Sequence, residues 1–423
     1  MIETHPQKSR ERALLIGLEK EGVSKWDLHD SLDELRELAN SAGAEVVDTV
    51  TQKLQKPTAP YYIGRGKAES IKESCQDQQV TSVIFNDELS PAQGRNLENL
   101  FARKVLDRTQ LILDIFAQRA RSREGRLQIE LAQLQYLLPR LTRMWHHLSR
   151  QTGGIGTRGP GETQLEVDRR RVQERIARLE RELESVRKTR AIQRQGRKRH
   201  QWPVAAVVGY TNAGKSTLLN LLTGADVVAE DKLFATLDPT TRSFVLPNKQ
   251  RVLLTDTVGF LRKLPHTLIE SFKATLEEVS EADLLIHIAD LSHPRVDEQM
   301  EAVDRVIKEL NAYGKQTLIV FNKIDNLPNR EVVDSHLKRF PSTVAISART
   351  GEGVNKLVQA LEGALSSWRL RSRFRIPAKE SALIAEIHRV GHVLELRYEG
   401  NDALIVAHVP PDLAQKLERY ADA

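Results

Sequence analysis

The sequence has little cysteine and no long hydrophobic run. Cys75 is the single cysteine among 423 residues, which excludes a disulfide framework and any cysteine-rich metal site and favours a reducing compartment. No apolar run approaches the roughly 20 residues that span a bilayer, and the stretch MIETHPQKSRER at the start lacks the apolar segment of a signal peptide. We therefore expect a soluble, cytoplasmic protein of about three domains.

Positive charge is concentrated in one segment. Residues 101–200 contain 24 Lys and Arg against 11 Asp and Glu, whereas the remainder of the chain contains 39 against 46. Such a concentration is typical of a protein that binds a polyanion, most often a nucleic acid. A solvated basic helix face without any partner would have the same composition, so both interpretations stay open here.

Residues 1–120 alternate short apolar runs with helical stretches. The expected strands are 13–18, 44–50, 81–86 and 104–107, and the expected helices are 27–42, 66–78 and 90–102. Ser90 and Pro91 suit the N-cap and the first position of the last helix. The alternation predicts a small α/β domain with a mainly parallel sheet.

Residues 121–199 carry a narrow apolar stripe on two successive helical stretches. Its members recur mostly at spacings of three and four: Leu127, Leu131, Leu134, Leu138, Leu141, Met144 and Leu148, then Leu165, Val172, Ile176, Leu179, Leu183 and Val186. Between the stretches lies GGIGTRGPGE (153–162), which is too rich in glycine for a helix. This pattern predicts an antiparallel helical hairpin with a flexible, basic tip and arms of about 24 residues, or about 36 Å, each. Pro139 should kink the first arm.

Two further segments complete the chain. RQGRKRH (194–200) is expected to be a charged linker into an α/β domain at 202–368. Residues 374–423 predict a small α+β domain, with a strand near 374, a helix at 381–390, strands at 393–398 and 403–408, and a helix from 411. Its sequence contains no motif that indicates a function.

The strongest signal in the chain is PVAAVVGYTNAGKSTLLNLL (203–222). An apolar strand leads into Gly209 and, after four residues, Gly214-Lys215-Ser216 at the start of a helix. The glycines allow backbone N–H groups to surround phosphates at the helix N-terminus. We expect Lys215 to reach the outer phosphates and the Ser216 hydroxyl to bind Mg²⁺.

A second apolar strand, VLLTDTVGF (252–260), ends in Asp256-Thr257-Val258-Gly259. We expect Asp256 to hold the Mg²⁺, through water, and the Gly259 N–H to sense the γ-phosphate. A third strand, TLIVFNKID (317–325), ends in Asn322-Lys323-Ile324-Asp325. A carboxylate there accepts from N1–H and the 2-amino group of guanine, whereas adenine would leave Asp325 desolvated and unpaired.

A fourth strand, VAISART (344–350), ends in Ser347-Ala348-Arg349, whose backbone N–H is expected to meet the guanine O6. Four motifs in order, each at the C-terminal end of a strand, form one site at a sheet edge. The fold class is therefore α/β, with a P-loop GTPase domain, an N-terminal α/β domain, a helical hairpin and a small C-terminal α+β domain. GTP is the expected substrate and Mg²⁺ the expected cofactor.

These motifs resemble those of the translation-factor-like GTPases. LFATLDPTTR (233–242) is the switch I candidate, and Thr236 is our choice for a second Mg²⁺ ligand that closes only when the γ-phosphate is present. Thr240 and Thr241 are the alternatives, because DPTTR resembles switch I of other GTPases in that group. All three are ordinary loop threonines in the plainest interpretation.

Two residues depart from the pattern of many small GTPases. Phe260 stands where those proteins place a glutamine that orients the attacking water, so intrinsic hydrolysis should be slow and a partner or an ion should supply the missing group. Asn212 occupies the place where potassium-activated GTPases carry an asparagine that coordinates K⁺. A monovalent cation there is a hypothesis; the alternative is that Asn212 only bonds to the loop.

The expected site residues can now be collected. Those expected to act in catalysis are Lys215, Asp256, Gly259 and Asn212, and those expected to contact the nucleotide or its metal are Gly209, Tyr210, Thr211, Asn212, Ala213, Gly214, Lys215, Ser216, Thr217, Phe234, Ala235, Thr236, Leu237, Asp238, Asp256, Thr257, Val258, Gly259, Asn322, Lys323, Asp325, Ser347, Ala348 and Arg349.

Segments outside these motifs carry a further resemblance. YYIGRGKAES (61–70), VLDRTQLILDIFAQRARSREGRLQIELAQLQYLLPRL (105–141) and GGIGTRGPGETQLEVDRR (153–170), together with GYTNAGKSTLLN and FATLDPTTR, resemble the HflX family of the Obg–HflX group over roughly residues 10–370. The resemblance implies a GTPase that binds the large ribosomal subunit and separates stalled or inactive ribosomes, notably in stress.

Ribosomal RNA would supply the polyanion that the basic hairpin suits. Side chains expected at RNA phosphates are Arg150, Arg158, Arg169, Arg170 and Arg171. The hairpin is poor in aromatic residues, with Tyr136 and Trp145 as its only base-stacking candidates, so recognition of RNA sequence is not indicated. The hairpin as a simple spacer between domains remains the alternative.

Other interpretations also stay open. Gly64-Arg65-Gly66-Lys67 invites a second phosphate site, although a plain strand-to-helix turn explains it as well. A GTP-dependent switch with a protein partner and an ATP-driven RNA remodelling enzyme that uses the N-terminal domain are the competing functions. Asp325 speaks against ATP at the main site, no DNA partner is indicated, and nothing requires more than a monomer.

Overall fold

The computed structural model describes residues 11–22, 24–141, 164–198, 202–224, 233–234, 236–262, 276–340, 343–366 and 370–422. The chain forms two compact units, and the division between Val186 and Arg187 falls within α6 (Gln164–Lys198), most of which belongs to the first unit. No helix among the described residues is long and apolar enough to cross a membrane.

The first unit contains an α/β domain followed by two long helices. Its elements are β1 (Arg12–Glu19), α1 (Lys25–Ser41), β2 (Glu45–Lys53), α2 (Arg65–Asp77), β3 (Ser82–Phe85), α3 (Pro91–Phe101), β4 (Lys104–Asp107), α4 (Arg108–Arg119), α5 (Arg123–Leu141) and α6 (Gln164–Lys198). The strands form a parallel sheet in the order β2-β1-β3-β4. The expected parallel sheet is confirmed.

Side-chain patterns explain how this sheet is covered. The first core cluster joins α2 and α3 to one face of the sheet, through residues such as Ile71 and Leu97. Ser90 and Gln93 form a reciprocal capping box at the start of α3, and Pro91 takes its first position, as expected from the sequence. The sequence analysis missed α4, because its apolar residues lie on nearly all sides and give no clear helical stripe.

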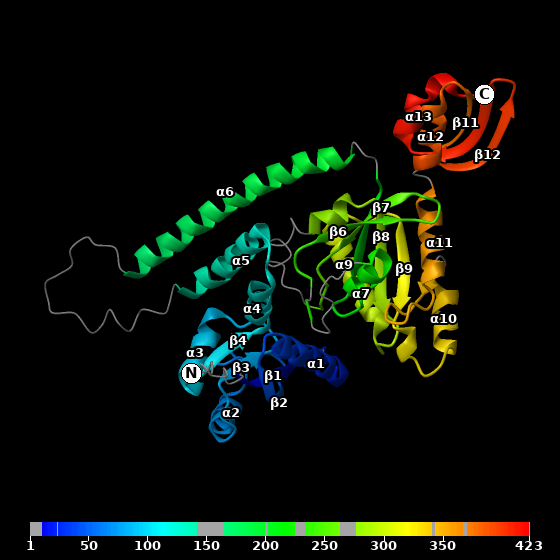
Figure 1. The fold of residues 1–423 in the computed structure, drawn as a ribbon. Helices are drawn as coiled ribbons and strands as arrows, with labels where there is room; N and C mark the ends of the chain where they lie inside the picture. Colours follow the sequence, from blue (N-terminus) through cyan, green and yellow to red (C-terminus); the bar gives the residue numbers. More distant parts are fainter. Residues whose placement is uncertain are drawn as a thin grey trace, which may run out of the picture. The chain divides into compact units, whose positions relative to one another are not determined.

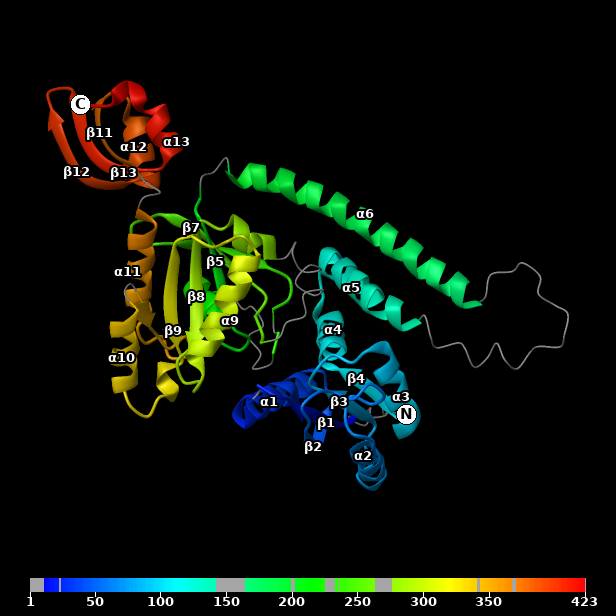
Figure 2. The ribbon, with the colours of Figure 1, turned by 180° about the vertical axis from the view of Figure 1, so that it is seen from behind.

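Helices α5 and α6 pack side by side through the predicted stripe (Figures 1 and 2). Leu127 and Leu131 of α5 meet Leu179 and Leu183 of α6. Across the same seam the Arg175 guanidinium donates two hydrogen bonds to Glu130, at 2.7 and 2.9 Å. The described parts of both expected arms are therefore helical and in contact. The expected tip at 153–162, with Met144, Trp145, Leu148, Arg150 and Arg158, lies outside the described residues.

The second helix is longer than expected. Helix α6 has 35 residues and continues to Lys198, so the prediction that residues 194–198 form a linker was wrong. Arg, Lys and Gln are good helix formers, and a single glycine in a long helix costs only about 1 kcal/mol. A charged segment without an apolar stripe can therefore extend a helix that is already nucleated. Pro139 lies within α5, close to its last described residue.

The second unit contains a larger α/β domain and a small C-terminal domain. Its elements are β5 (Val204–Gly209), α7 (Lys215–Thr223), β6 (Thr240–Val245), β7 (Arg251–Asp256), β8 (Leu284–Asp290), α9 (Val296–Glu309), β9 (Thr317–Asn322), η1 (Ile324–Asn326), α10 (Glu331–Arg339), β10 (Thr343–Ala345), α11 (Val354–Ala364), β11 (Leu370–Pro377), α12 (Ser381–Val390), β12 (His392–Glu399), β13 (Asp402–Val409), α13 (Pro411–Lys416) and η3 (Glu418–Tyr420).

The larger sheet has the order β10-β9-β8-β5-β7-β6, and only β6 runs antiparallel to its neighbour. One core cluster joins α7 and α11 to one face, for example through Leu218 and Leu357. Another joins α9 and α10 to β8 and β9 through residues such as Met300 and Val333. Strands buried on both faces explain the near-continuous apolar runs in the sequence (Figure 1). Their C-terminal ends lie at one edge, where the predicted motifs follow.

The C-terminal domain is an antiparallel sheet in the order β11-β13-β12. One face packs against α12 and α13 around Phe374, Ile387, Ile405 and Leu413. All the elements predicted for this region are present, so its α+β class is confirmed. A single helix-covered face gives the regular alternation of buried and half-buried residues along β13.

Candidate functional site

The glycine-rich loop after β5 is closely packed against neighbouring strands. Gly214 has φ 95°, and a Cβ there would lie 2.2 Å from Nδ2 of Asn322. Both the left-handed backbone and the close approach therefore require glycine. Asn322 donates to the Ala213 carbonyl at 2.8 Å, so the loop is held by a side chain from another strand.

Lys215 is the first residue of α7 and is almost fully buried. Its Nζ donates to the carbonyl oxygens of Tyr210 at 2.8 Å and Gly209 at 3.3 Å. Burial lowers the pKa of Lys215 to about 8, and the nearby Asp256 carboxylate opposes this shift. The ammonium group therefore lies in a low-dielectric position, where a bound anion would stabilise its charge.

Ser216, Thr236 and Asp256 converge on one point. The Ser216 and Thr236 hydroxyls both donate to Oδ2 of Asp256, at 2.6 and 2.8 Å, and their oxygens lie 2.8 Å apart. Burial raises the pKa of Asp256, and the Lys215 charge, these two hydrogen bonds and the backbone N–H of Thr257 oppose that effect. Within the described part of the chain, Oδ1 of Asp256 is buried without a hydrogen-bond partner.

This set of oxygens fits a magnesium ion. A carboxylate and two hydroxyls are hard ligands of the kind that Mg²⁺ prefers, and Mg²⁺ usually completes its shell with water and substrate phosphates. The orphaned Oδ1 of Asp256 is the observation that favours a missing cation or its bound water. No cluster of three or more His, Cys, Asp or Glu side chains suited to a metal occurs among the described residues.

The two alternative threonines lie elsewhere, on β6. Oγ1 of Thr241 is 2.9 Å from Oγ1 of Thr255, and the Thr240 hydroxyl donates to the Asp238 carbonyl at 3.5 Å. Neither hydroxyl bonds to the Asp256 carboxylate, although Thr240 lies opposite Asp256 in the β6–β7 pairing. In the segment before β6, Phe234 and Leu237 are buried, Asp238 is half-buried, and Ala235 lies outside the described residues.

The segment after β7 is joined to the phosphate loop. The Thr211 N–H donates to the Phe260 carbonyl at 2.8 Å, and the Phe260 N–H donates to Gly209 at 3.1 Å. A Cβ at Gly259 would lie 2.9 Å from Nζ of Lys215, so glycine leaves room for a phosphate there. The Phe260 ring is fully buried, while the Phe260 backbone pairs with the phosphate loop.

The neighbouring residues have structural bonds of their own. The Thr257 hydroxyl donates to the Val207 carbonyl at 2.7 Å, and Val258 is buried. The Tyr210 hydroxyl accepts from the Arg262 N–H at 2.8 Å, and Thr217 lies in the first turn of α7. These contacts position the two loops relative to each other.

Asn322 connects the loops expected to bind the base. Besides its bond to Ala213, it accepts from the Ala348 N–H at 2.9 Å. Lys323 has φ 63° and forms an ion pair with Asp290 at 2.8 Å. Asp325, in η1, is exposed. Its carboxylate therefore faces solvent at the place where the sequence predicts a guanine.

The last motif differs in detail from the expectation. The Ser347 N–H donates to the Glu352 carbonyl at 2.9 Å and the Ala348 N–H to Asn322, so both already have protein acceptors. Arg349 is exposed at the same loop. Of the three, only the Arg349 N–H has no acceptor among the described residues.

Asn212 has a structural reason of its own. Its φ is 60°, a left-handed conformation that asparagine tolerates better than most residues. The side chain is exposed, and among the described residues no bond to the loop is found for it. The structure therefore does not support the interpretation in which the Asn212 side chain bonds to the loop. The left-handed backbone at this position is a separate reason for asparagine.

The sequence analysis missed one buried polar residue close to this site. His287 lies within the apolar strand β8 and is 2% exposed. Burial, followed by the effect of the Lys215 charge, lowers the pKa of His287 to about 4. Its Nδ1 is 3.8 Å from the Asp304 carboxylate of α9. The sequence signal that could have revealed this residue is a single histidine within the otherwise apolar strand LLIHIAD.

Asn322 joins the phosphate loop to the loop of Ser347, Ala348 and Arg349 at one edge of the sheet. The phosphates and the base of a nucleotide would therefore bind side by side there. That arrangement defines the class of a P-loop GTPase. Comparison of the sequence with known families agrees. Models described as GTP-binding GTPase N-terminal, GTP-binding GTPase Middle Region and 50S ribosome-binding GTPase match residues 29–117, 119–197 and 204–323.

Full-length relatives give the family. The chain is 48% identical to the GTPase HflX of Caldanaerobacter subterraneus subsp. tengcongensis over 98% of this chain and 94% of the relative. It is 48% identical to the GTPase HflX of Escherichia coli K12 over 86% and 85%. A GTP-binding protein from Sulfolobus solfataricus, solved with GDP, aligns with 25% identity and a TM-score of 0.46 over 84% of this chain and 99% of that one. On the sequence identities, the chain belongs to the GTPase HflX family, and it is a GTP hydrolase.

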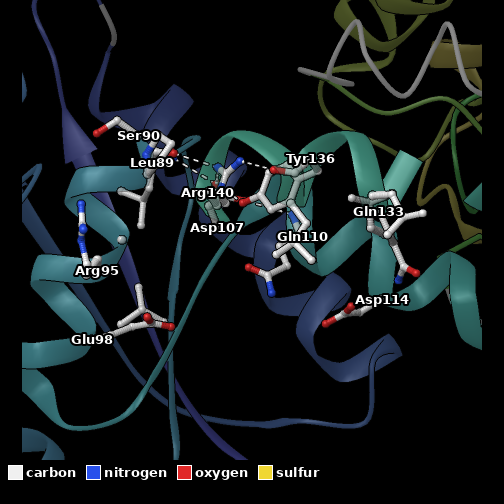
Figure 3. Close-up of a pocket in the computed structure, with 16 residues that line it drawn as sticks. Leu89, Ser90, Arg95, Glu98, Asp107, Gln110, Asp114, Gln133, Tyr136 and Arg140 are labelled. Atoms are coloured by element: carbon white, nitrogen blue, oxygen red, sulfur yellow. Dashed lines mark hydrogen bonds and ion pairs between the residues drawn. The ribbon is translucent and has the colours of Figure 1, made fainter. Parts of the chain in front are cut away.

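The N-terminal domain has a cavity of about 460 Å³ beside β4 (Figure 3). Asp107 accepts there from the Tyr136 hydroxyl at 2.7 Å, the Leu89 N–H at 3.1 Å, Arg140 at 3.2 Å and, at the other oxygen, the Gln110 N–H at 2.9 Å. The Arg140 guanidinium lies 3.4 Å from the centre of the Tyr136 ring. Tyr136 is thus half-buried and already has protein partners on its hydroxyl and its ring, which argues against its role as a base-stacking candidate.

The second glycine-containing turn, at 64–67, opens α2 directly. The Gly64 N–H donates to Oε1 of Gln52 at 2.9 Å, and Arg65 pairs with Glu69 one turn later at 3.0 Å. Protein groups therefore occupy both the first N–H and the nearest basic side chain. These contacts favour a strand-to-helix turn over a phosphate site.

Proposed function

We propose that this GTPase docks on the large ribosomal subunit in its GTP state, separates stalled or inactive ribosomes, notably in stress, and is released by hydrolysis. The proposal places it in the cytoplasm as a monomer. The observation that carries it is the cluster of Ser216, Thr236 and Asp256, because it links a loop before β6 to the phosphate site. The match of residues 204–323 to a model described as 50S ribosome-binding GTPase supports the choice of partner.

In this proposal Ser216 and Thr236 hold Mg²⁺ directly and Asp256 holds it through water. The ion would supply positive charge against the β- and γ-phosphates. Lys215 would leave the carbonyls of Tyr210 and Gly209 and bind the outer phosphates. The Gly259 N–H would sense the γ-phosphate, and loss of that phosphate would free Thr236 and its segment.

Asp325 would select guanine by accepting from N1–H and the 2-amino group, with the Arg349 N–H at O6. The substitution Asp325→Asn should weaken GTP binding by about 100-fold, because an amide presents a donor to the guanine donors. A fluorescent GTP titration measures this. Exposed Asp334→Asn on α10 is the matched control. Unchanged GTP affinity in Asp325→Asn would remove the assignment of this loop to the base.

The hydrolytic step needs a group that Phe260 cannot supply. Asn212 could bind K⁺ beside the phosphates, and turnover should then be faster in KCl than in NaCl. The variant Asn212→Gly keeps the left-handed backbone but removes the amide oxygen, so it should keep GTP affinity and lose the stimulation by K⁺. Equal turnover of the unaltered protein in the two salts would overturn the potassium hypothesis.

The basic α6 helix would contact ribosomal RNA. Arg169, Arg170 and Arg171 are exposed in its first turns. RNA phosphates neutralised by such side chains release counterions, so docking should weaken steeply as salt rises. A protein partner bound mainly through apolar contacts would show a shallow salt dependence.

The test is GTP hydrolysis with and without purified large ribosomal subunits, in KCl at two ionic strengths. We expect a large stimulation that Arg169→Glu/Arg170→Glu abolishes. Lys56→Glu/Lys72→Glu, at exposed positions of the N-terminal domain, makes the same change in net charge and should leave the stimulation intact. Absence of stimulation would leave the GTPase standing and remove the ribosome as its partner.

A further inference from the structure

The C-terminal sheet has one face that α12 and α13 leave uncovered. Residues paired across antiparallel strands share a face, so the strand register identifies its members. Phe374 and Ile376 of β11 point to the helices with Ile405 and Ala403 of β13. The residues between them point the other way.

The uncovered face consists of cross-strand rows. In the order β11, β13, β12 these rows are Arg371–His408–His392, Arg373–Val406–Glu395, Arg375–Leu404–Arg397 and Pro377–Asp402–Glu399. Arginine therefore occupies three consecutive outward positions of β11. We call the first two rows the basic end of the sheet and the last row its acidic end.

Ion pairs neutralise the acidic end. Arg375 lies within 3.9 Å of the carboxylates of Glu399, Asp402 and Asp422. In the rows beside this end, Arg397 pairs at 2.5 Å with Glu395, which is the one carboxylate in the rows of the basic end. The acidic end of the face has its charges balanced internally and offers little to a charged partner.

The basic end has a different charge balance. Arg371 and Arg373 are exposed, and no carboxylate of the described residues lies within ion-pair distance of either side chain. The His392 and His408 rings, 6.5 Å apart, adjoin Arg371 in the same row. Uncompensated guanidinium groups on a flat sheet give a local positive potential that suits a polyanion.

Among anionic groups, phosphates suit the arginine side chains of this face best. The planar guanidinium of arginine binds phosphate oxygens in pairs, and it is more weakly hydrated than lysine. Alternate residues of a strand lie about 6.8 Å apart, which is comparable with the separation of successive phosphates along one nucleic-acid strand. Half-buried Val406 and Leu404 occupy the middle of the face, and the only aromatic rings in its four rows are the two imidazoles beside Arg371, so it lacks a large aromatic platform for stacked bases.

We propose that the basic end of the C-terminal sheet is a second RNA-binding surface, which holds the sugar–phosphate backbone through Arg371 and Arg373. Binding is independent of base sequence and separate from the contact proposed for α6. The choice of RNA among polyanions rests on the proposed ribosomal function. An acidic protein surface is the other occupant that such a face would accept.

The test uses the full chain and a labelled RNA duplex of about 16 base pairs. In fluorescence anisotropy at about 0.1 M salt, Arg371→Glu/Arg373→Glu should raise Kd at least tenfold. The slope of log Kd against log salt should fall by about 2, because two phosphate contacts are lost. Arg371→Lys/Arg373→Lys should keep most of the slope and lose part of the affinity.

The matched control is Lys379→Glu/Arg389→Glu, which makes the same charge change in the turn before α12 and in its last turn. It should change Kd less than twofold. Equal losses in the two double variants would show general electrostatics and overturn the proposal. Unchanged RNA affinity in Arg371→Glu/Arg373→Glu, with loss of binding to large subunits, would assign the face to an acidic protein instead.

Failure of the ribosomal assignment can be told apart from failure of this surface. Ultraviolet crosslinking of the RNA duplex to residues 370–377 depends only on the sheet. Crosslinking retained in Arg169→Glu/Arg170→Glu, together with no stimulation by large subunits, would keep the RNA surface and remove the ribosome. Absence of crosslinks from 370–377 in the unaltered chain would overturn the surface itself.

Discussion

Two buried aspartates, one in each unit, each end a strand that pairs in parallel with a neighbour, and yet they serve different purposes. Asp107 ends β4 and Asp256 ends β7, and they are 2% and 0% exposed. Asp107 accepts hydrogen bonds at both carboxylate oxygens, including one from Arg140. Asp256 accepts from two hydroxyls at one oxygen and has the other unpaired within the described residues.

The difference separates a structural group from one prepared for a ligand. Burial of a charge is tolerated when partners compensate it, and Asp107 has such partners from α5, from the first turn of α4 and from the loop before α3. Burial of an incompletely paired carboxylate beside Lys215 is unfavourable until a cation and phosphates arrive. Position in the fold is therefore not sufficient to identify a site, whereas the completeness of hydrogen bonding distinguishes the two aspartates.

The largest expected effect is that of replacing Asp256, the aspartate assigned to ligand binding. Asp256→Asn should lower the rate of GTP hydrolysis by about 100- to 1,000-fold, because the charge that positions the metal and its water is lost. The free energy of unfolding of the nucleotide-free protein should change by less than about 1 kcal/mol, since a poorly paired buried charge is removed. Turnover assays and urea unfolding measure the two quantities. A full loss of stability together with activity would contradict the distinction.

The second effect, at Asp107, is the opposite: a loss of stability without a loss of GTP binding. Asp107→Asn should destabilise the first unit by about 2 kcal/mol, because it leaves half-buried Arg140 without its counter-charge. GTP affinity should not change. Amide hydrogen exchange in α4 and α5 measures the loss. The control is Asp114→Asn. Asp114 lines the same cavity and burial raises its pKa, so the substitution should have little effect. Normal exchange in Asp107→Asn would refute the structural role.

The third effect concerns His287 beneath the phosphate loop. Its pKa is lowered to about 4 in the folded state, so the unfolded state binds the proton first as pH falls below about 6.5. Its contribution to stability is therefore present above pH 6.5 and is lost toward pH 4, by about 2 kcal/mol at pH 5. Urea unfolding at pH 7.5 and pH 5 should show this loss in the unaltered chain. His287→Leu should lose less, whereas exposed His29→Leu should match the unaltered protein.

The smallest effect sharpens the account of Lys215. Its pKa is about 8 without nucleotide, and a phosphate must raise it again, so GTP binding takes up a proton above that pH. Kd for GTP should rise by up to about tenfold per pH unit above pH 8. Fluorescent GTP titrations between pH 7 and pH 9 measure this. Lys215→Arg should bind more weakly but without that pH dependence, and a flat profile in the unaltered protein would rule the mechanism out.

Local patterns in the sequence were sufficient for the class of fold and for most of the nucleotide motifs. Apolar strands, the glycines of the phosphate loop and the alternation of strand and helix act over a few residues, so spacing and residue type reveal them. The same holds for the capping residues of α3 and for the apolar stripe shared by α5 and α6.

Only the tertiary structure decided which distant groups meet. Thr236, not Thr240 or Thr241, reaches Asp256, and Arg140 and Tyr136 satisfy Asp107. The extension of α6 through its charged end and the basic end of the C-terminal sheet likewise depend on a helix already formed and on strand register. Such pairings join residues far apart in the chain, and their energies depend on burial and on complete hydrogen bonding, which no local pattern records.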